Sequence, residues 1–558
     1  MFLHKDNVNN PTNLERYSIM EELLINSRRD PRELPGIVNA LSPPADITSI
    51  AKPGTFKNKK VAIIGAGAAG LSAAFQLRKL GFDITIFEAR ENRVGGRIYT
   101  YYFNSENYGE LGAMRIPVSH ETTWHYINLL GLNTRPFVQV NPNAFIYVKN
   151  TRVRNDPEGE NVKREIYPKF RMKNWERQLS WTELLGYAMD TPLLEMSPEL
   201  RIELLHIRKI TNSVINYWDY FNHRQVMEKL GLSSGAINML NSVSPFTRLL
   251  LYYSYIETAM ENSSLSSSIM YEIVGGNSLL PLALYKSLTS PNPKEYTGIE
   301  AKDLGKIDIR MGTWVEGICR LEQRNKVGII HNNKKNLGAK KEDFDYVVCA
   351  IPFSTLRNVD INPLFSNRKM EAIMEVNYTL AQKTLLFCNK RFWQEQGIMG
   401  GGSFTDLPIS TLWYPSDGKS TAQPGVFIAS YNLELDAIRF GNLPRFLKLE
   451  ELKNQVERVH GLPYGYLDRV VIDWKYLNWH DESWSLGAFC YFLPEQRRLF
   501  LYAMGVPEYN NKVFFAGEHV SVTHGWMNGA LQTGMKAAND LAIEAVCHSE
   551  PSHKGNSN

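Results

Sequence analysis

Short apolar runs along the chain alternate with longer segments in which apolar residues follow helical spacing. The run Val61–Ile64 is short and rich in branched side chains, which predicts a buried parallel strand. A second strand is predicted over Asp83–Phe87, and an amphipathic helix over Leu71–Lys79 connects the two. This order of elements predicts a Rossmann-like βαβ unit that begins at about Lys60.

Residues 168–270 show mainly helical spacing. Ser197 followed by a proline and an acid predicts the start of a helix. The apolar positions that follow recur at steps of three and four residues and predict one face of a helix: Ile207, Ile210, Val214 and Trp218. A further helix is predicted from about Ser233.

The later part of the chain returns to strand patterns. Buried strands are predicted at Trp314–Cys319 and Tyr346–Ile351, and a last strand at Val513–Phe515 leads into a glycine-rich turn. A helix is predicted over Gly529–Val546, and residues 378–500 alternate strand signals with aromatic-rich turns. We interpret the latter region as a separate sheet that binds the substrate.

Three glycines lie at the turn between the first strand and its helix: Gly65, Gly67 and Gly70. In a dinucleotide-binding turn, the first permits the tight turn, the second lets the backbone approach a pyrophosphate, and the third packs helix on strand. The helix N-terminus offers free N–H groups and a positive dipole end. Glu88 has the spacing of a carboxylate that binds the adenosine ribose. Neighbouring alanines complete the predicted contacts: Ala66, Ala69 and Ala89.

A second glycine-rich segment, RENRVGGR, covers residues 90–97. A nicotinamide dehydrogenase has no reason to carry it. Its glycines, among them Gly96, let the backbone pass close to a second part of a long cofactor, and Arg97 can neutralise phosphate or flavin charge. Arg90 is a further predicted cofactor contact. The sequence therefore predicts FAD as the dinucleotide.

The predicted fold class is α/β with an α+β substrate sheet. We expect a Rossmann-like FAD-binding domain built from discontinuous pieces, into which a substrate-binding domain and a helical domain are inserted. The predicted division is a helical arm and linker over 1–59, an FAD-binding domain over 60–98, 271–375 and 505–548, a substrate-binding domain over 99–167 and 376–504, a helical domain over 168–270, and a disordered tail over 549–558.

Composition narrows the function classes. The chain has 558 residues, of which 43% are hydrophobic and 22% charged, and a formal net charge of +4 without a basic block, which argues against nucleic-acid binding. We find no apolar core of signal-peptide length and no segment suited to crossing a bilayer, so we expect a cytoplasmic protein without membrane contact. The five cysteines lack metal-ligand spacing, and His519 and His524 lack a third ligand, so we expect no metal site.

Several motifs resemble those of the flavin-containing amine oxidases, and within them the L-amino-acid oxidases, the branch that includes the snake-venom enzymes. They are VAIIGAGAAGLSAAFQL, GGR, GELGAMRIP at 109–117, IVGG at 273–276, KRFW at 390–393, AGEH at 516–519 and HGWMNGALQTG at 524–534. The resemblance spans roughly residues 60–540. It implies noncovalent FAD, an L-amino acid and oxygen as reactants, 2-oxo acid, ammonia and hydrogen peroxide as products, and a homodimer or higher homo-oligomer.

The resemblance also implies roles for single residues. Arg115 corresponds to the arginine that clamps the substrate carboxylate, and a guanidinium fork suits that task. Tyr414 corresponds to the tyrosine that gives the carboxylate a second donor, and the carbonyl of Gly525 receives the amino group. The alternatives are a structural salt bridge or flavin contact for Arg115 and a buried core tyrosine for Tyr414.

Three further residues have roles by the same resemblance. Lys383 corresponds to a lysine that holds a water near the flavin, with a surface lysine as the alternative. Phe489 and Trp526 correspond to the two walls of an aromatic sandwich, with ordinary core packing as the alternative. The remaining predicted cofactor contacts are Gly112, Ala113, Met114, Arg115, Val315, Glu518, Trp526 and Met527.

Two departures from related enzymes affect the prediction. Ala488 occupies the position at which monoamine oxidases carry a flavin-binding cysteine, although Cys490 lies two residues further along. Residues 254–270 contain no histidine, so the role of the venom enzymes' histidine in this region does not transfer. Aromatic residues around the pocket predict large apolar or aromatic substrates, whereas Glu257 and Glu261 could select a basic side chain or simply be solvated.

Three other functions fit many of the same motifs. A flavin amino-acid 2-monooxygenase would decarboxylate its substrate to the amide, and an amine or polyamine oxidase would not need the carboxylate clamp. A flavin-holding interaction protein without turnover is the third, and the presence of Arg115, Lys383 and Trp526 argues against it.

Overall fold

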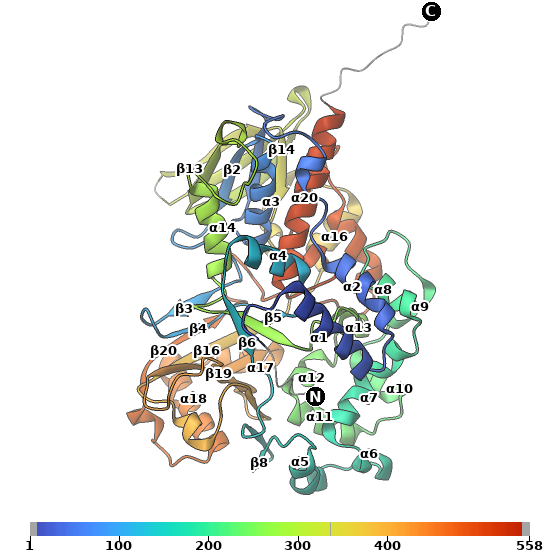
Figure 1. Cartoon of the computed structure of the whole chain (residues 1–558), viewed down its shortest axis with the longest axis vertical. Helices are drawn as coiled ribbons and strands as arrows, with labels where there is room; N and C mark the ends of the chain where they lie inside the picture. Colours follow the sequence, from blue (N-terminus) through green and yellow to red (C-terminus); the bar gives the residue numbers. More distant parts are fainter. Residues whose placement is uncertain (1–7, 335, 549–558) are drawn as a thin grey trace, which may run out of the picture.

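The computed structural model describes residues 8–334 and 336–548 (Figure 1). A parallel five-stranded sheet with helices α3 and α20 forms one end of the molecule, the top in Figure 1. A seven-stranded sheet and a group of helices form the opposite end. This mixed architecture confirms the predicted α/β class. The predicted disordered tail, 549–558, lies outside the described residues.

The five-stranded sheet assembles strands from distant parts of the chain in the order β10-β2-β1-β14-β21. Its strands are β1 (Lys60–Ile64), β2 (Asp83–Glu88), β10 (Ile307–Met311), β14 (Tyr346–Cys349) and β21 (Val513–Phe515). Helix α3 (Ala68–Lys79) follows β1, as predicted, and α20 (Met527–Cys547) packs against it. A Cβ at Gly534 of α20 would lie 2.3 Å from the carbonyl oxygen of Ala69, so glycine permits this close packing.

The seven-stranded sheet carries the second half of the site. Its order is β20-β16-β19-β18-β17-β7-β8. The strands are β7 (Phe145–Val148), β8 (Thr151–Arg154), β16 (Ala381–Cys388), β17 (Gly402–Thr405), β18 (Thr411–Trp413), β19 (Gly425–Leu433) and β20 (Val471–Asn478). In this sheet Lys383 pairs directly with Tyr431 across β16 and β19, so the two side chains share a face.

Three smaller sheets connect these parts. They contain β11 (Thr313–Leu321), β12 (Lys326–Asn333), β13 (Asn336–Phe344) and β15 (Asp360–Asn362); β5 (Ile116–Pro117), β6 (Thr134–Phe137) and β9 (Met270–Ile273); and β3 (Thr100–Tyr102) with β4 (Tyr108–Glu110). Besides α3 and α20, the helices outside the helical region are α1 (Asn13–Asn26), α2 (Leu34–Leu41), α4 (Glu121–Leu129), α5 (Glu160–Glu165), α14 (Leu279–Thr289), α15 (Phe353–Leu356), α16 (Asn367–Glu375), α17 (Glu434–Gly441), α18 (Arg445–His460) and α19 (Tyr502–Gly505).

The predicted helical region contains several short helices. They are α6 (Asn174–Gln178), α7 (Trp181–Leu194), α8 (Pro198–Glu203), α9 (Ser213–Asp219), α10 (His223–Lys229), α11 (Ser234–Val243), α12 (Pro245–Leu250) and α13 (Tyr255–Ser263). The starts predicted near Ser197 and Ser233 are confirmed, since both side chains accept a backbone N–H of their helix. The single apolar face predicted over residues 207–218 is wrong. Asn212 caps a new helix by accepting from Val214, and Ile210 is 85% exposed.

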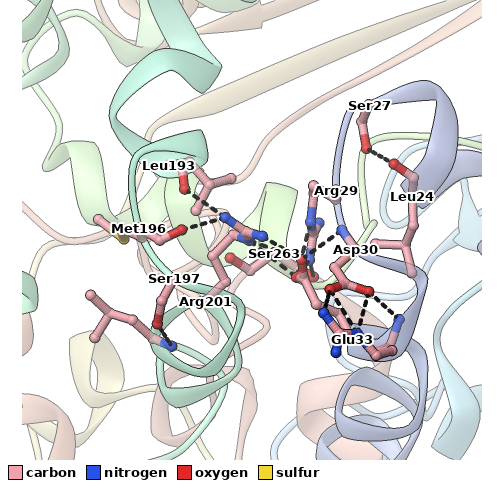
Figure 2. A network of polar contacts seen from close by, with 12 residues as sticks. Leu24, Ser27, Arg29, Asp30, Glu33, Leu193, Met196, Ser197, Arg201 and Ser263 are labelled. Carbon is pink, nitrogen blue, oxygen red and sulfur yellow. Dashed lines mark hydrogen bonds and ion pairs between the residues drawn. The ribbon is translucent and has the colours of Figure 1, made fainter.

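A buried ion network joins the N-terminal arm to the helical region (Figure 2). Glu33 accepts from Arg29 and from Arg201, each at 2.5 Å, and its side chain is fully buried. Both guanidinium groups also donate to backbone carbonyls at the ends of α7 and α13. Because every charge in the network is paired, the arm is fixed against the helices that border the cavity described below. Within the described residues, no helix has the length and apolarity that a membrane span requires.

Candidate active site

One cavity of about 1350 Å³ extends from the N-terminus of α3 to the seven-stranded sheet and the helical region. Typical ligand pockets measure about 300–1,000 Å³, so this space suits more than one small ligand. All of the cofactor residues predicted from the sequence line it except Ala66 and Gly70. Ala66 lies in the turn and Gly70 in the first turn of α3, and both are buried.

The β1–α3 turn has the backbone geometry that a pyrophosphate requires. Gly65 adopts a φ of +99°, and a Cβ at Gly70 would lie 2.0 Å from the carbonyl oxygen of Gly65. Gly67 caps α3 without a side-chain hydrogen bond, and a Cβ built there meets nothing within 4 Å. Free N–H groups of the first helical turn therefore face open space, where a phosphate can bind.

Glu88 lies at the end of β2, where an adenosine ribose is expected. Its two carboxylate oxygens accept from the backbone N–H groups of Ala66 at 2.8 Å and Arg90 at 2.9 Å. Burial raises the pKa of Glu88, and these hydrogen bonds oppose the shift. A carboxylate has about four lone-pair sites, so Glu88 can still accept from two hydroxyls. The turn and this acid together fit a dinucleotide.

Arg97 and Glu518 connect the glycine-rich segment to the turn before α20. The guanidinium of Arg97 donates to Glu518 Oε1 at 2.7 Å and to the carbonyl of Ala488 at 3.2 Å. The other oxygen of Glu518 accepts the backbone N–H of Gly525 at 2.8 Å. Because these bonds fix the backbone at Gly525, its orientation depends on a side chain more than 400 residues earlier in the chain.

Lys383 is a buried residue of the cavity wall, which excludes the surface alternative. Its Nζ donates to the carbonyl oxygen of Gly112 at 2.7 Å and lies 4.5 Å from the centre of the Tyr431 ring. Burial lowers the pKa of Lys383, the nearby charge of Arg115 adds to this, and Glu110 opposes it. The amine is therefore poised to lose its proton far more readily than a lysine in water.

Arg115 faces the same cavity without a carboxylate partner. Its guanidinium carbon lies 5.3 Å from the Trp413 ring, 5.7 Å from Phe246 and 6.0 Å from Trp526. It donates to Gln139 Oε1 at 3.3 Å, but among the described residues no Asp or Glu oxygen lies within the 4.0 Å of an ion pair. The structural salt bridge considered from the sequence is therefore absent from this part of the chain.

The structure places Tyr414 away from the cavity, which corrects the sequence expectation. The hydroxyl of Tyr414 donates to Ser403 Oγ at 2.9 Å and lies 2.8 Å from His460 Nε2, and the side chain is 1% exposed. Neighbouring residues of an extended chain point to opposite faces, so the adjacent Trp413 lines the cavity instead.

Tyr431 is the cavity tyrosine that sequence reasoning missed. It lines the cavity next to Lys383, its neighbour on the adjacent strand. Burial raises the pKa of its hydroxyl, and the charge of Arg115 opposes this shift. The only signal in the sequence was a tyrosine near the end of a strand that begins apolar, GVFIASYNL. That pattern does not tell which face of the sheet the tyrosine occupies.

Phe489, Gly525 and Trp526 all line the cavity. Gly525 has a φ of +77°, and a Cβ there would lie 3.1 Å from Phe489 Cδ2. Trp526 caps the N-terminus of α20 and contacts His120 edge-on with ring centres 5.2 Å apart. Ala488 also lines the cavity, whereas Cys490 is fully buried behind it.

Glu257 and Glu261 on α13 are not solvated surface residues, contrary to one sequence alternative. Glu257 is 2% exposed and accepts from His524 Nδ1 at 3.0 Å. Burial lowers the pKa of His524, but the charge and hydrogen bond of Glu257, together with the charge of Glu518 and the carbonyl of His519, raise that pKa overall. Glu261 lines the cavity beside Trp526.

Among the described residues no group of three metal-ligating side chains occurs.

Comparison with known proteins connects this geometry to a family. The sequence profile of the flavin containing amine oxidoreductases matches residues 68–542. The chain is 29% identical to an L-amino-acid oxidase of Vipera ammodytes ammodytes, covering 87% of this chain and 93% of that protein. It is 30% identical to the L-amino-acid oxidase of Protobothrops flavoviridis over 87% and 89% of the two chains. A putrescine oxidase solved with bound putrescine has the same fold, with a TM-score of 0.65 over 86% of this chain and 98% of that one at 15% identity.

Proposed function

Because the chain belongs to the flavin-containing amine oxidoreductase family, we propose that it oxidises an L-amino acid with FAD as cofactor and oxygen as acceptor. The products would be a 2-oxo acid, ammonia and hydrogen peroxide. The observation that carries the proposal is the unpaired guanidinium of Arg115 in an aromatic-lined cavity. A buried cation without a partner is costly, and a substrate carboxylate would supply the missing charge.

The residues around the dinucleotide turn would hold FAD. The first turn of α3 would receive the pyrophosphate, and Glu88 would accept the ribose hydroxyls. We propose noncovalent binding, since Ala488 faces the cavity where a cysteine would be needed and Cys490 is buried. When bound, FAD accepts a hydride from the substrate α-carbon and passes the electrons to oxygen.

The protein side chains would orient the substrate for this reaction. Arg115 would grip the carboxylate with its guanidinium fork, and the hydroxyl of Tyr431 would add a second donor. The backbone carbonyl of Gly525 would accept from the amino group. Phe489 and Trp526 would exclude water, which favours the neutral amine from which a hydride can leave.

Lys383 would act in the step that consumes oxygen. Its amine faces the cavity and can hold a water or stabilise negative charge as oxygen is reduced. We propose no separate general base. Instead, loss of the amino proton would follow from transfer of the substrate out of water into the slot between Phe489 and Trp526.

Anaerobic mixing of the yellow holoenzyme with single amino acids tests the proposal. L-amino acids should bleach the visible flavin band, while D-amino acids and decarboxylated amines should leave it unchanged. Bleaching by an amine but by no amino acid would make the chain an amine oxidase. After oxygen is admitted, a product mixture that contains the amide in place of the 2-oxo acid would indicate a monooxygenase. A band that stays yellow with every compound would support a flavin-holding protein.

A further inference from the structure

Glu261 is the one carboxylate on the helical side of the cavity that lies beside the proposed aromatic walls. It comes from the last turns of α13, and its Oε2 accepts from the Tyr491 hydroxyl at 3.4 Å. Trp526 lies beside this carboxylate. Among the described residues no lysine, arginine or histidine nitrogen lies within 4.0 Å of it. Its one hydrogen-bond donor in this part of the chain is therefore neutral.

Two nearby buried carboxylates have cationic partners: Glu33 holds two arginines and Glu257 holds His524. Buried Asp219 has none and instead accepts from the Ser254 hydroxyl and a backbone N–H. Among the described residues, the carboxylate of Glu261 has neither a cationic partner nor a backbone donor, only the long hydrogen bond from Tyr491. Burial raises the pKa of Glu261, the charge of Arg115 lowers it, and Glu257 raises it further. A cation that enters the cavity would offset the free-energy cost of removing the Glu261 carboxylate from water without an ion-pair partner.

Glu261 and Arg115 border the same side chain but do not pair with each other. Arg115 lies 6.0 Å from the Trp526 ring, and Trp526 is also a neighbour of Glu261. The cavity therefore presents a positive and a negative group near one tryptophan, each without an ion-pair partner among the described residues. A ligand that satisfies both must carry an anion and a cation separated by an apolar stem, which aromatic rings can cover.

A second carboxylate lines the same cavity further from Arg115. Asp190 on α7 accepts from Asn262 Nδ2 at 2.7 Å, and among the described residues it has no cationic partner within 4.0 Å. Asn262 follows directly after Glu261 on α13, so the two carboxylates lie on adjacent helical walls. Two acids without cationic partners among the described residues, on adjacent helices, favour a cationic group on this side of the cavity.

We propose that Glu261 selects L-amino acids with a positively charged side chain, such as lysine, ornithine or arginine. This inference rests on the proposed function, in which Arg115 holds the α-carboxylate. The side-chain cation would then reach Glu261 past Trp526. It replaces the large apolar or aromatic preference expected from the sequence, because an apolar side chain would leave the carboxylate buried without a partner.

L-lysine and L-norleucine form the decisive pair, since they share the α-carbon groups and differ at the end of the side chain by the ammonium group. Anaerobic bleaching of the wild-type flavin should saturate at a concentration of L-lysine about tenfold or more below that of L-norleucine. The variant Glu261→Gln should raise the half-saturating concentration of L-lysine by about tenfold or more and leave that of L-norleucine unchanged or lower. Glu450→Gln, the same change on the exposed face of α18, should alter neither.

Each other outcome has a definite meaning. Equal shifts for both substrates in Glu261→Gln, or a wild type that prefers L-norleucine, would overturn the selection by Glu261 while leaving amino-acid oxidation intact. Bleaching by the diamine derived from lysine, but by no amino acid, would overturn the proposed function itself. If Glu261→Gln does not fold, the wild-type comparison and the shorter acid in Glu261→Asp still decide the question.

Discussion

Arg115 provides the sharpest test of how the substrate is held. Its guanidinium is stacked among three aromatic rings and keeps one neutral hydrogen bond, to Gln139 at 3.3 Å. Two hydrogen bonds to a carboxylate would each contribute about 1.5–3 kcal/mol. Removal of both in Arg115→Gln should therefore cost about 3–6 kcal/mol, which corresponds to a factor of about 10²–10⁴ in kcat/KM for amino acids. The neutral glutamine leaves no exposed charge behind, so the fold should persist.

Arg115→Lys separates charge from geometry. A lysine keeps the positive charge but cannot offer the planar fork, so we expect about tenfold to hundredfold weaker binding of amino acids. Stopped-flow reduction of the flavin under nitrogen gives both the limiting rate and the apparent affinity. The flavin spectrum of the oxidised variants is the control for an intact cofactor site. Wild-type affinity of Arg115→Lys for amino acids would refute the clamp.

Three further predictions concern other parts of the structure. Tyr431→Phe should lower kcat/KM by about tenfold to hundredfold, because the substrate carboxylate loses one hydrogen-bond donor. Tyr414→Phe should leave kcat/KM unchanged. The reverse pattern in steady-state assays would contradict the placement of these two tyrosines. The rate at which oxygen reoxidises the flavin should fall as pH rises through the lowered pKa of Lys383, because the amine loses its proton above that pKa. In Lys383→Met, flavin reoxidation should be slower by about tenfold or more and should lack this pH dependence. Glu33→Gln should destabilise the protein by about 3–5 kcal/mol, since two buried arginines lose their counter-ion, and an unchanged thermal midpoint would show that the network contributes little.

Local sequence was sufficient for elements whose signals lie within a few residues. The β1–α3–β2 unit, the tight turn at Gly65 and the helix starts at Ser197 and Ser233 all agree with the prediction. Each depends on backbone conformation or hydrogen bonds between near neighbours, which residue types determine directly. The predicted helical face over residues 207–218 failed because a cap at Asn212 interrupts a pattern that hydrophobic spacing alone suggested.

The candidate site residues show the same difference between what local sequence predicts and what depends on the fold. The sequence by itself determined which residues form the dinucleotide turn and that Arg115, Lys383 and Trp526 carry suitable chemistry. Only the tertiary structure decided that Tyr431 faces the cavity and Tyr414 does not. The physical reason is that side chains of a strand alternate between two faces, so a shift of one residue reverses every assignment. Whether a carboxylate such as Glu261 is paired depends in turn on strands and helices that meet it from hundreds of residues away, and these contacts exist only after folding.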